Sequence, residues 1–221
     1  MNGTTHEIGG IAAGFVTASI IYGVGSIVSF TITQNTLDPE FHFRSLANMC
    51  LIGGAIGGLW CDLDKKDTKA SNKNPLLSWF IRNFTTHRGA LHSPLLNAFI
   101  CYLLMYLMTL FIPWLNNIFN TSTNEIVLKI GFLWNCFCKF VYFITGTSNV
   151  SLCIKPFFHG MFAGTLSHIL LDMLNPKGVP LFWPISNKKI SIMNLNGTRH
   201  SVVVSIFIIG LVFVGLYFGI I

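Results

Sequence analysis

The fold class is decided by residues 94–115, which read PLLNAFICYLLMYLMTLFIPWL. This stretch carries no charged side chain and exceeds the roughly 20 residues that a helix needs to cross the hydrocarbon core of a bilayer. The rest of the chain agrees with it, because its 221 residues are 52% hydrophobic and only 10% charged. Soluble domains usually carry more than twice that share of charge. The sequence therefore predicts a protein whose solvent is mostly lipid.

Further apolar segments lie on both sides of this stretch. They cover residues 8–32, 46–60, 126–145, 156–174 and 202–221. Several of them repeat glycine at a four-residue spacing, such as Gly53 with Gly57 and Gly160 with Gly164, and this spacing lets helices approach closely in lipid. No repeat or linker divides the chain. The segments predict a single all-α domain over residues 1–221, an integral membrane helical bundle.

Most of the 14 Lys and Arg residues lie in two loops, at 61–92 and 175–201. The positive-inside rule places both loops on the cytoplasmic face, which six simple crossings cannot achieve. The segment 126–145 contains Lys129, Asn135 and Lys139, and we expect it to be interfacial or re-entrant. About five transmembrane helices remain, with the N-terminus cytoplasmic. The net charge of +6 then serves orientation, so it indicates the lipid bilayer as partner and not a nucleic acid.

This topology brings the polar residues of the chain to one face of the membrane. His168 and Asp172 are four positions apart on a predicted helix, so both project from the same side. Asp62 and Asp64 lie where the second segment ends, and Ser93 is the expected N-cap of the third. Imidazole and carboxylate groups are typical ligands of zinc, manganese and iron. The candidate metal ligands are His6, Asp62, Asp64, His87, His92, His168 and Asp172.

These candidates exceed the four ligands of one tetrahedral site, so we expect one or two divalent ions, zinc first, with manganese and iron as alternatives. Water held by such an ion is acidic enough to act as a nucleophile near neutral pH, which points to hydrolysis. Asp64 is the candidate catalytic carboxylate. Arg88 is the candidate clamp for a phosphate, or the partner of one of the aspartates. His159 falls on the side of its helix opposite to His168 and is excluded.

Three other interpretations remain open. The same residues could bind metal without catalysis, or form an ion or proton pathway, as ionisable residues inside membranes often do. A catalytic metal keeps an open coordination position, whereas a structural one is closed. A regulator that binds a partner through its basic loops would keep its activity with alanine at His168 and Asp172. The six cysteines contain no Cys-x-x-Cys pair, so neither a thiolate zinc site nor a disulfide framework is indicated.

The order of these motifs resembles the YdjM-type family, described as LexA-binding, inner-membrane-associated metal-dependent hydrolases. The matching stretches are Thr5-His6, GGLWCDLD at 57–64, Ser71, HRGALHS at 87–93 and GTLSHILLDMLNPKGVPLFWP at 164–184. The resemblance covers most of residues 1–100 and 160–185. This chain departs from the family pattern at Leu59-Trp60-Cys61, where leucine-proline is usual, and at Lys65, where a histidine is common. The second departure implies one fewer ligand.

The resemblance implies a multi-pass protein of the inner membrane that performs metal-dependent hydrolysis. The family passes almost directly from the third span to the Ser-His helix, so the segment 126–145 is expected to be an insertion that leaves the topology unchanged. We therefore expect metal-activated water to attack a phosphoester or another lipid-associated bond at the cytoplasmic membrane face.

Overall fold

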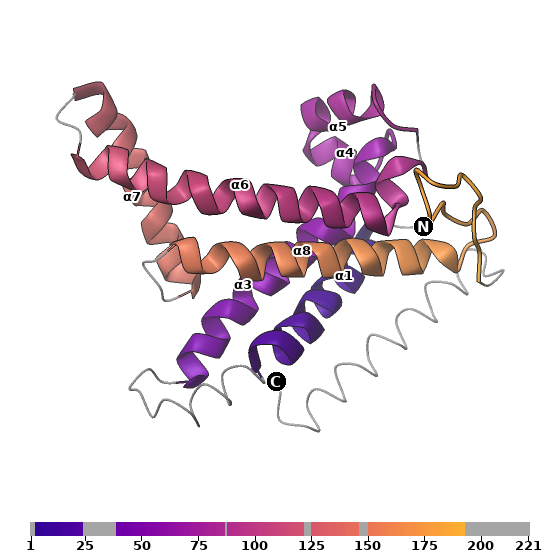
Figure 1. Cartoon of the computed structure of the whole chain (residues 1–221), viewed down its shortest axis with the longest axis horizontal. Coiled ribbons are helices and arrows are strands. Elements are labelled where there is room, and N and C mark those ends of the chain that lie inside the picture. The colour runs from indigo at the N-terminus through magenta and orange to yellow at the C-terminus, as the bar shows by residue number, and fades with distance from the viewer. Residues whose placement is uncertain (1–2, 24–38, 87, 122–124, 146–149, 193–221) are drawn as a thin grey trace.

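A computed structural model describes residues 3–23, 39–86, 88–121, 125–145 and 150–192 (Figure 1). This part of the chain is helical and contains no strand; its β structure is limited to one antiparallel bridge between Val179 and Ile190. The all-α prediction is thus confirmed for the described residues. The apolar segment predicted at 202–221 lies outside them.

The described residues contain five long helices. They are α1 (Gly3–Thr17), α3 (Pro39–Trp60), α6 (Pro94–Thr121), α7 (Glu125–Thr145) and α8 (Val150–Met173). A π-helix, Ala18–Gly23, continues α1. Helices α1, α3 and α8 pack against one another, α6 runs alongside α8 in the opposite direction, and α7 lies beyond the far end of α6 (Figure 1).

Glycine lets the three packed helices touch backbone to backbone. A Cβ atom at Gly58 of α3 would overlap the carbonyl oxygen of His6 in α1, and one at Gly57 would overlap the carbonyl oxygen of Met161 in α8. Helix α3 therefore contacts α1 and α8 through adjacent faces on which glycines allow close backbone approach. This confirms that the small-residue spacing serves helix packing. It also brings the first turn of α1 and the last turns of α8 to the C-terminal end of α3.

Two helices in the described chain are long and apolar enough to cross a membrane, Leu46–Asp64 and Pro94–Phe119. Helix α1 has only 15 residues, which is about 22 Å at 1.5 Å per residue. Helix α8 interrupts its apolar run with Lys155, His159 and Asp172. The apolar part of α7, Ile130–Ile144, is shorter than a span. The remaining crossings of the expected five stay a prediction.

The segment predicted as a loop at 61–92 contains short helices instead. They are the 3-10 helix η2 (Cys61–Asp64), α4 (Lys69–Lys73), α5 (Pro75–Arg82) and the 3-10 helix η3 (Ala90–His92). Helix α4 starts with a capping box, in which Thr68 and Ser71 each accept the other's backbone N–H. Pro75 begins α5, where its missing N–H has no cost. Helices of this length are much shorter than a membrane span, so the apolar pattern of the sequence does not indicate them.

The start of α6 follows its prediction, and two other helices start earlier than predicted. Ser93 caps α6, since its Oγ accepts the backbone N–H of Leu96 at 3.5 Å. Helix α3 begins at Pro39 instead of residue 46, because its first turns are too polar to count as an apolar run. Helix α8 begins at Val150 instead of at the predicted residue 156, so Pro156 lies inside the helix.

The segment after α8 folds back over the end of the bundle. The backbones of Val179 and Ile190 exchange hydrogen bonds of 3.0 and 2.9 Å, and the N–H of Ile192 donates to the carbonyl of Met173 at 2.8 Å. Val179 is fully buried and packs in a cluster with Cys61 and other apolar side chains at the end of α8. This segment therefore closes the end of the bundle where α3 and α8 terminate.

Candidate metal centre

The structure gathers histidine and aspartate side chains where α1 begins and α3 and α8 end. His6, His168 and Asp172 each offer one ligand atom, and these atoms lie within 4.8 Å of one another. All three side chains are buried. His168 and Asp172 lie one helical turn apart, with His168 Nε2 3.9 Å from Asp172 Oδ2. This group could hold a metal ion.

The main chain of α3 sets the proton position on His168. Its Nδ1 lies 2.7 Å from the carbonyl oxygen of Gly58. A carbonyl oxygen only accepts, so Nδ1 carries the hydrogen and the neutral ring keeps its lone pair on Nε2. Gly58 belongs to the last turn of α3, whose final carbonyls have no partner within the helix. A hydrogen bond on the second nitrogen is the usual way to orient a metal-binding histidine.

His6 stacks on His168 from the first turns of α1. The two ring centroids are 3.7 Å apart and the ring planes meet at 21°. His6 Nε2 lies 3.7 Å from Asp172 Oδ1. The backbone contact between His6 and Gly58 makes this approach possible, because any side chain at residue 58 would push α1 away.

His92 connects the two aspartates from the turn before α6. Its Nε2 lies 3.4 Å from Asp172 Oδ2 and its Nδ1 lies 3.4 Å from Asp64 Oδ2. Burial disfavours the imidazolium, but hydrogen bonding to Asp172 and Asp64 outweighs it and raises the pKa of His92 to about 9. The two buried carboxylates therefore favour a positive charge between them.

Arg88 is the second positive group at the cluster. Its Nη2 donates to Asp172 Oδ1 at 3.1 Å, so the sequence alternative of pairing with an aspartate is the one observed. Its backbone has a φ of 57°, an uncommon value for a residue other than glycine. Its Nε and Nη1 atoms are buried and have no hydrogen-bond partner among the described residues.

Asn175 was not predicted, although it also binds Asp172. Its Nδ2 donates to Asp172 Oδ1 at 3.2 Å. Asn175 lies two residues beyond the end of α8 at Met173, in the bend that follows the helix. An asparagine just before a proline is typical of a turn, so its contact with Asp172 has no distinct signal in the sequence.

The other sequence candidates have different outcomes. Asp62 and Asp64 both lie in η2. Asp62 is only half buried and makes no ion pair within the described chain. His87 lies outside the described residues. His159 packs edge-on against Tyr102 of α6, with ring centroids 6.2 Å apart, and is not part of the cluster.

The residues present fit a divalent metal. His168 Nε2 and His6 Nδ1 are buried and have no hydrogen-bond partner in the part of the chain that the structure describes. Leaving a buried polar atom unpaired costs about 1–3 kcal/mol, and a cation bound to these nitrogens would remove that cost. The donor set of imidazole nitrogen and carboxylate oxygen suits zinc, and also manganese or iron. The identity of the metal is not fixed by these groups.

The fold and this cluster define a helical membrane protein with a buried His/Asp group that could bind metal. The family model "YdjM inner membrane protein" matches residues 1–220, and the chain belongs to this family. The resemblance seen in the sequence and the inner-membrane location are thereby confirmed. No curated protein and no solved structure matches the chain.

Proposed function

We propose that this protein is a membrane-bound, metal-dependent hydrolase whose metal, zinc first, binds at His6, His168 and Asp172. The observation that carries the proposal is the hydrogen bond from His168 Nδ1 to the carbonyl of Gly58, which leaves Nε2 as a buried lone pair facing Asp172. This tautomer presents the free nitrogen that a metal ligand requires. When bound, the divalent ion supplies an acidified water molecule that can act as a nucleophile.

The neighbouring residues have roles that follow from their contacts. His92 lies between Asp172 and Asp64 and can pass a proton from one carboxylate to the other. Asp64 is then the general base. Asp62 and His87 remain candidate ligands of a second ion.

Arg88 supports a phosphoester as substrate. One of its terminal nitrogens is held by Asp172, and the other two nitrogens, Nε and Nη1, are buried without a partner among the described residues. A guanidinium held in this way can donate the N–H bonds that Asp172 does not take to the oxygens of a phosphate. Because the chain lies in the membrane, we favour a phosphoester or another bond carried by a lipid.

A closed, non-catalytic metal site is the second candidate. Its support is the burial of the cluster, since His168 and His92 are 0% exposed and Asp172 is 3% exposed. Catalytic sites keep one metal position open to substrate. Cobalt-loaded protein separates the two functions, because inorganic phosphate changes its visible absorption spectrum only if a coordination position is open.

The topology that supports this function has about five crossings, with the cluster at the cytoplasmic face. Helices α6 and α8 run in opposite directions, and α7 joins their far ends (Figure 1). An insertion of this kind leaves the ends that carry His92 and His168 on one side. Cysteine-accessibility labelling that places residues 70 and 188 on opposite faces would remove this topology.

Elemental analysis of purified protein tests the metal ligands without knowledge of the substrate. We expect His168→Asn to lose bound metal, because its amide N–H still donates to Gly58 while the second ring nitrogen is gone. The matched control is His159→Asn, the same change in the same helix against Tyr102, and it should keep its metal. Equal metal in both variants and the wild type would refute the ligand assignment of His168.

A further inference from the structure

Helix α5 exposes an unusual amount of apolar surface. Leu76 is 82% exposed and Trp79 is 62% exposed, and Phe80 and Phe84 are also largely uncovered. These side chains form one face of a short amphipathic helix and the turn after it. The opposite face is buried, since Ser78 is 0% exposed and its Oγ donates to the carbonyl of Leu63 at 2.7 Å. Large exposed apolar patches mark surfaces that contact another apolar phase.

The position of α5 in the fold indicates that this apolar phase is the lipid bilayer. The helix is joined through η2 to the span Leu46–Asp64, and the span Pro94–Phe119 begins shortly after it. Helix α5 lies between the ends of these two spans, which places it at the surface of the inner membrane. Aromatic side chains are enriched at this depth, where they meet the lipid headgroups.

The charges around α5 complement an anionic lipid surface. Lys65, Lys66, Lys73 and Arg82 occur within a short stretch of chain, against the exposed acid Asp67. Lys69 is neutralised by an ion pair with Glu7. Lys73 makes no ion pair within the described chain and remains available to a phosphate. Basic residues near an anionic membrane surface are attracted to its lipid phosphates.

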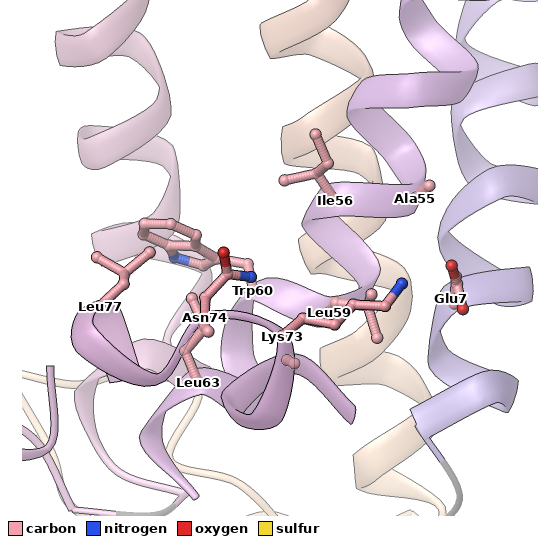
Figure 2. A pocket seen from close by; sticks show the side chains of 10 residues that line it. Glu7, Ala55, Ile56, Leu59, Trp60, Leu63, Lys73, Asn74 and Leu77 are labelled. Atoms are coloured by element: carbon pink, nitrogen blue, oxygen red, sulfur yellow. The ribbon is translucent and has the colours of Figure 1, made fainter. Parts of the chain in front are cut away.

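A pocket lies between α3 and the turn that joins α4 to α5, with Glu7 of α1 on its far side (Figure 2). Its volume is about 370 Å³, which falls within the roughly 300–1,000 Å³ of small-molecule sites. The apolar part of its lining comes from Ile56, Leu59, Leu63 and Leu77.

Two polar residues of the pocket stand beside α5 and fit the glycerol and headgroup region of a lipid, while Glu7 on the far side is paired with Lys69. Lys73 and Asn74 line the pocket beside α5, and Lys73 extends toward α1 (Figure 2). Trp60 also lines the pocket, and its indole Nε1 is buried with no hydrogen-bond partner among the described residues. A buried donor without a partner costs free energy unless a ligand supplies an acceptor, and the ester carbonyl of a lipid is such an acceptor.

We propose that α5 lies in the headgroup layer of the bilayer and that the pocket beneath it binds an acyl chain of an anionic phospholipid, with Lys73 at the phosphate. The lipid enters between α5 and α3, and the exposed aromatic face of α5 holds the mouth of the pocket at the level of the membrane lipids. The proposal does not rest on the metal centre or on hydrolysis.

Quenching of tryptophan fluorescence by brominated lipid tests this arrangement in the full-length protein. The probe is a vesicle of phosphatidylglycerol with bromine either close to the headgroup or at mid-chain. The emission that Trp79→Phe removes belongs to Trp79, and the emission that Trp60→Phe removes belongs to Trp60. We expect bromine near the headgroup to quench Trp79 in the headgroup layer and also Trp60, whose indole would meet the ester end of the bound chain, and mid-chain bromine to quench both less.

A pocket-filling variant separates a bound chain from lipid that merely lies near Trp60. Ala55→Phe places a ring in the pocket, and we expect quenching of Trp60 to be lost while that of Trp79 stays. The control is Ile52→Phe, which adds a ring one turn away on α3 outside the pocket lining. If Ala55→Phe does not fold, Leu77→Phe fills the pocket from the opposite wall.

Two results would overturn the proposal. Trp79 left unquenched would mean that water or protein covers α5, and quenching of Trp60 that persists in the filled pocket would mean that no chain binds there. Neither result bears on the metal content of the same protein, so failure here is distinguishable from failure of the metal site.

Discussion

The two candidate spans are used in opposite ways. Half of the apolar stretch of α3 is buried against protein, compared with 17% for α6, although α6 is the more apolar of the two. Helix α3 has glycine on the faces toward α1 and α8, whereas α6 presents large side chains such as Phe99 and Trp114 outward. Apolarity thus identifies the helix that faces lipid, and small residues identify the helix that holds the bundle together.

The same contrast explains where the metal cluster can form. Closely packed backbones hold His6, Gly58 and His168 within contact distance of one another. Helix α6 contributes through the residues just before its start, where His92 lies. The site therefore depends on the packing of α3 far more than on the lipid-facing surface of α6.

The largest effect is expected from Gly57→Ala. The new methyl group would overlap the backbone of Met161, so α8 must move away from α3, at a cost of about 2 kcal/mol or more. Thermal unfolding in detergent should show a lower midpoint, and bound metal should decrease because His168 moves with α8. The control Gly131→Ala in α7 adds the same methyl group 3.5 Å from Phe119, an ordinary contact. Equal midpoints for the two variants would contradict this account of α3.

A smaller effect is expected where α7 joins α6. Trp134 Nε1 donates to Asn116 Oδ1 at 2.7 Å, and Trp134→Phe removes this hydrogen bond while keeping a ring in place. The loss should be about 1 kcal/mol, measured by the unfolding midpoint, with metal content unchanged. Loss of metal in this variant would show that the α6–α7 region is coupled to the site.

The smallest effect is expected from Phe99→Ala on α6. Phe99 is 63% exposed, so lipid or detergent replaces the ring without leaving a cavity. Changes at such positions usually stay within about 0.5 kcal/mol. A large decrease of the unfolding midpoint would mean that protein, and not lipid, covers this face of α6.

Several features could be predicted from the sequence because they depend on local spacing. His168 and Asp172 share a helix face by their four-residue separation, and the cap at Ser93 follows from the residue before Pro94. The all-α class follows from apolar length. The meeting of His6 and His92 at the end of α8 depends on topology. The positive-inside rule predicts it, because it places the N-terminus and the 61–92 segment on the same face of the membrane.

Other features depend on contacts between distant segments and could not be predicted from spacing. Nothing in the sequence around Gly58 indicates that its carbonyl accepts from His168, because main-chain acceptors leave no compositional signal. The choice of Asp172 as the partner of Arg88 is equally a matter of tertiary geometry. Helix α5 is not predicted from the apolar pattern because its eight residues are far fewer than a membrane span, although Pro75 at its first position is typical of a helix start.

The hydrogen bond to Gly58 makes the place where α3 stops part of the chemistry. If α3 continued as a regular helix for another turn, the carbonyl of residue 58 would accept the backbone N–H of residue 62 and would be less free for the imidazole. Insertions or deletions in the Trp60–Asp64 stretch would then change the tautomer of a histidine more than a hundred positions away. The residue at which α3 ends thus decides whether His168 Nε2 keeps a lone pair for a metal. A substitution at position 58 changes the side chain but cannot remove the carbonyl acceptor.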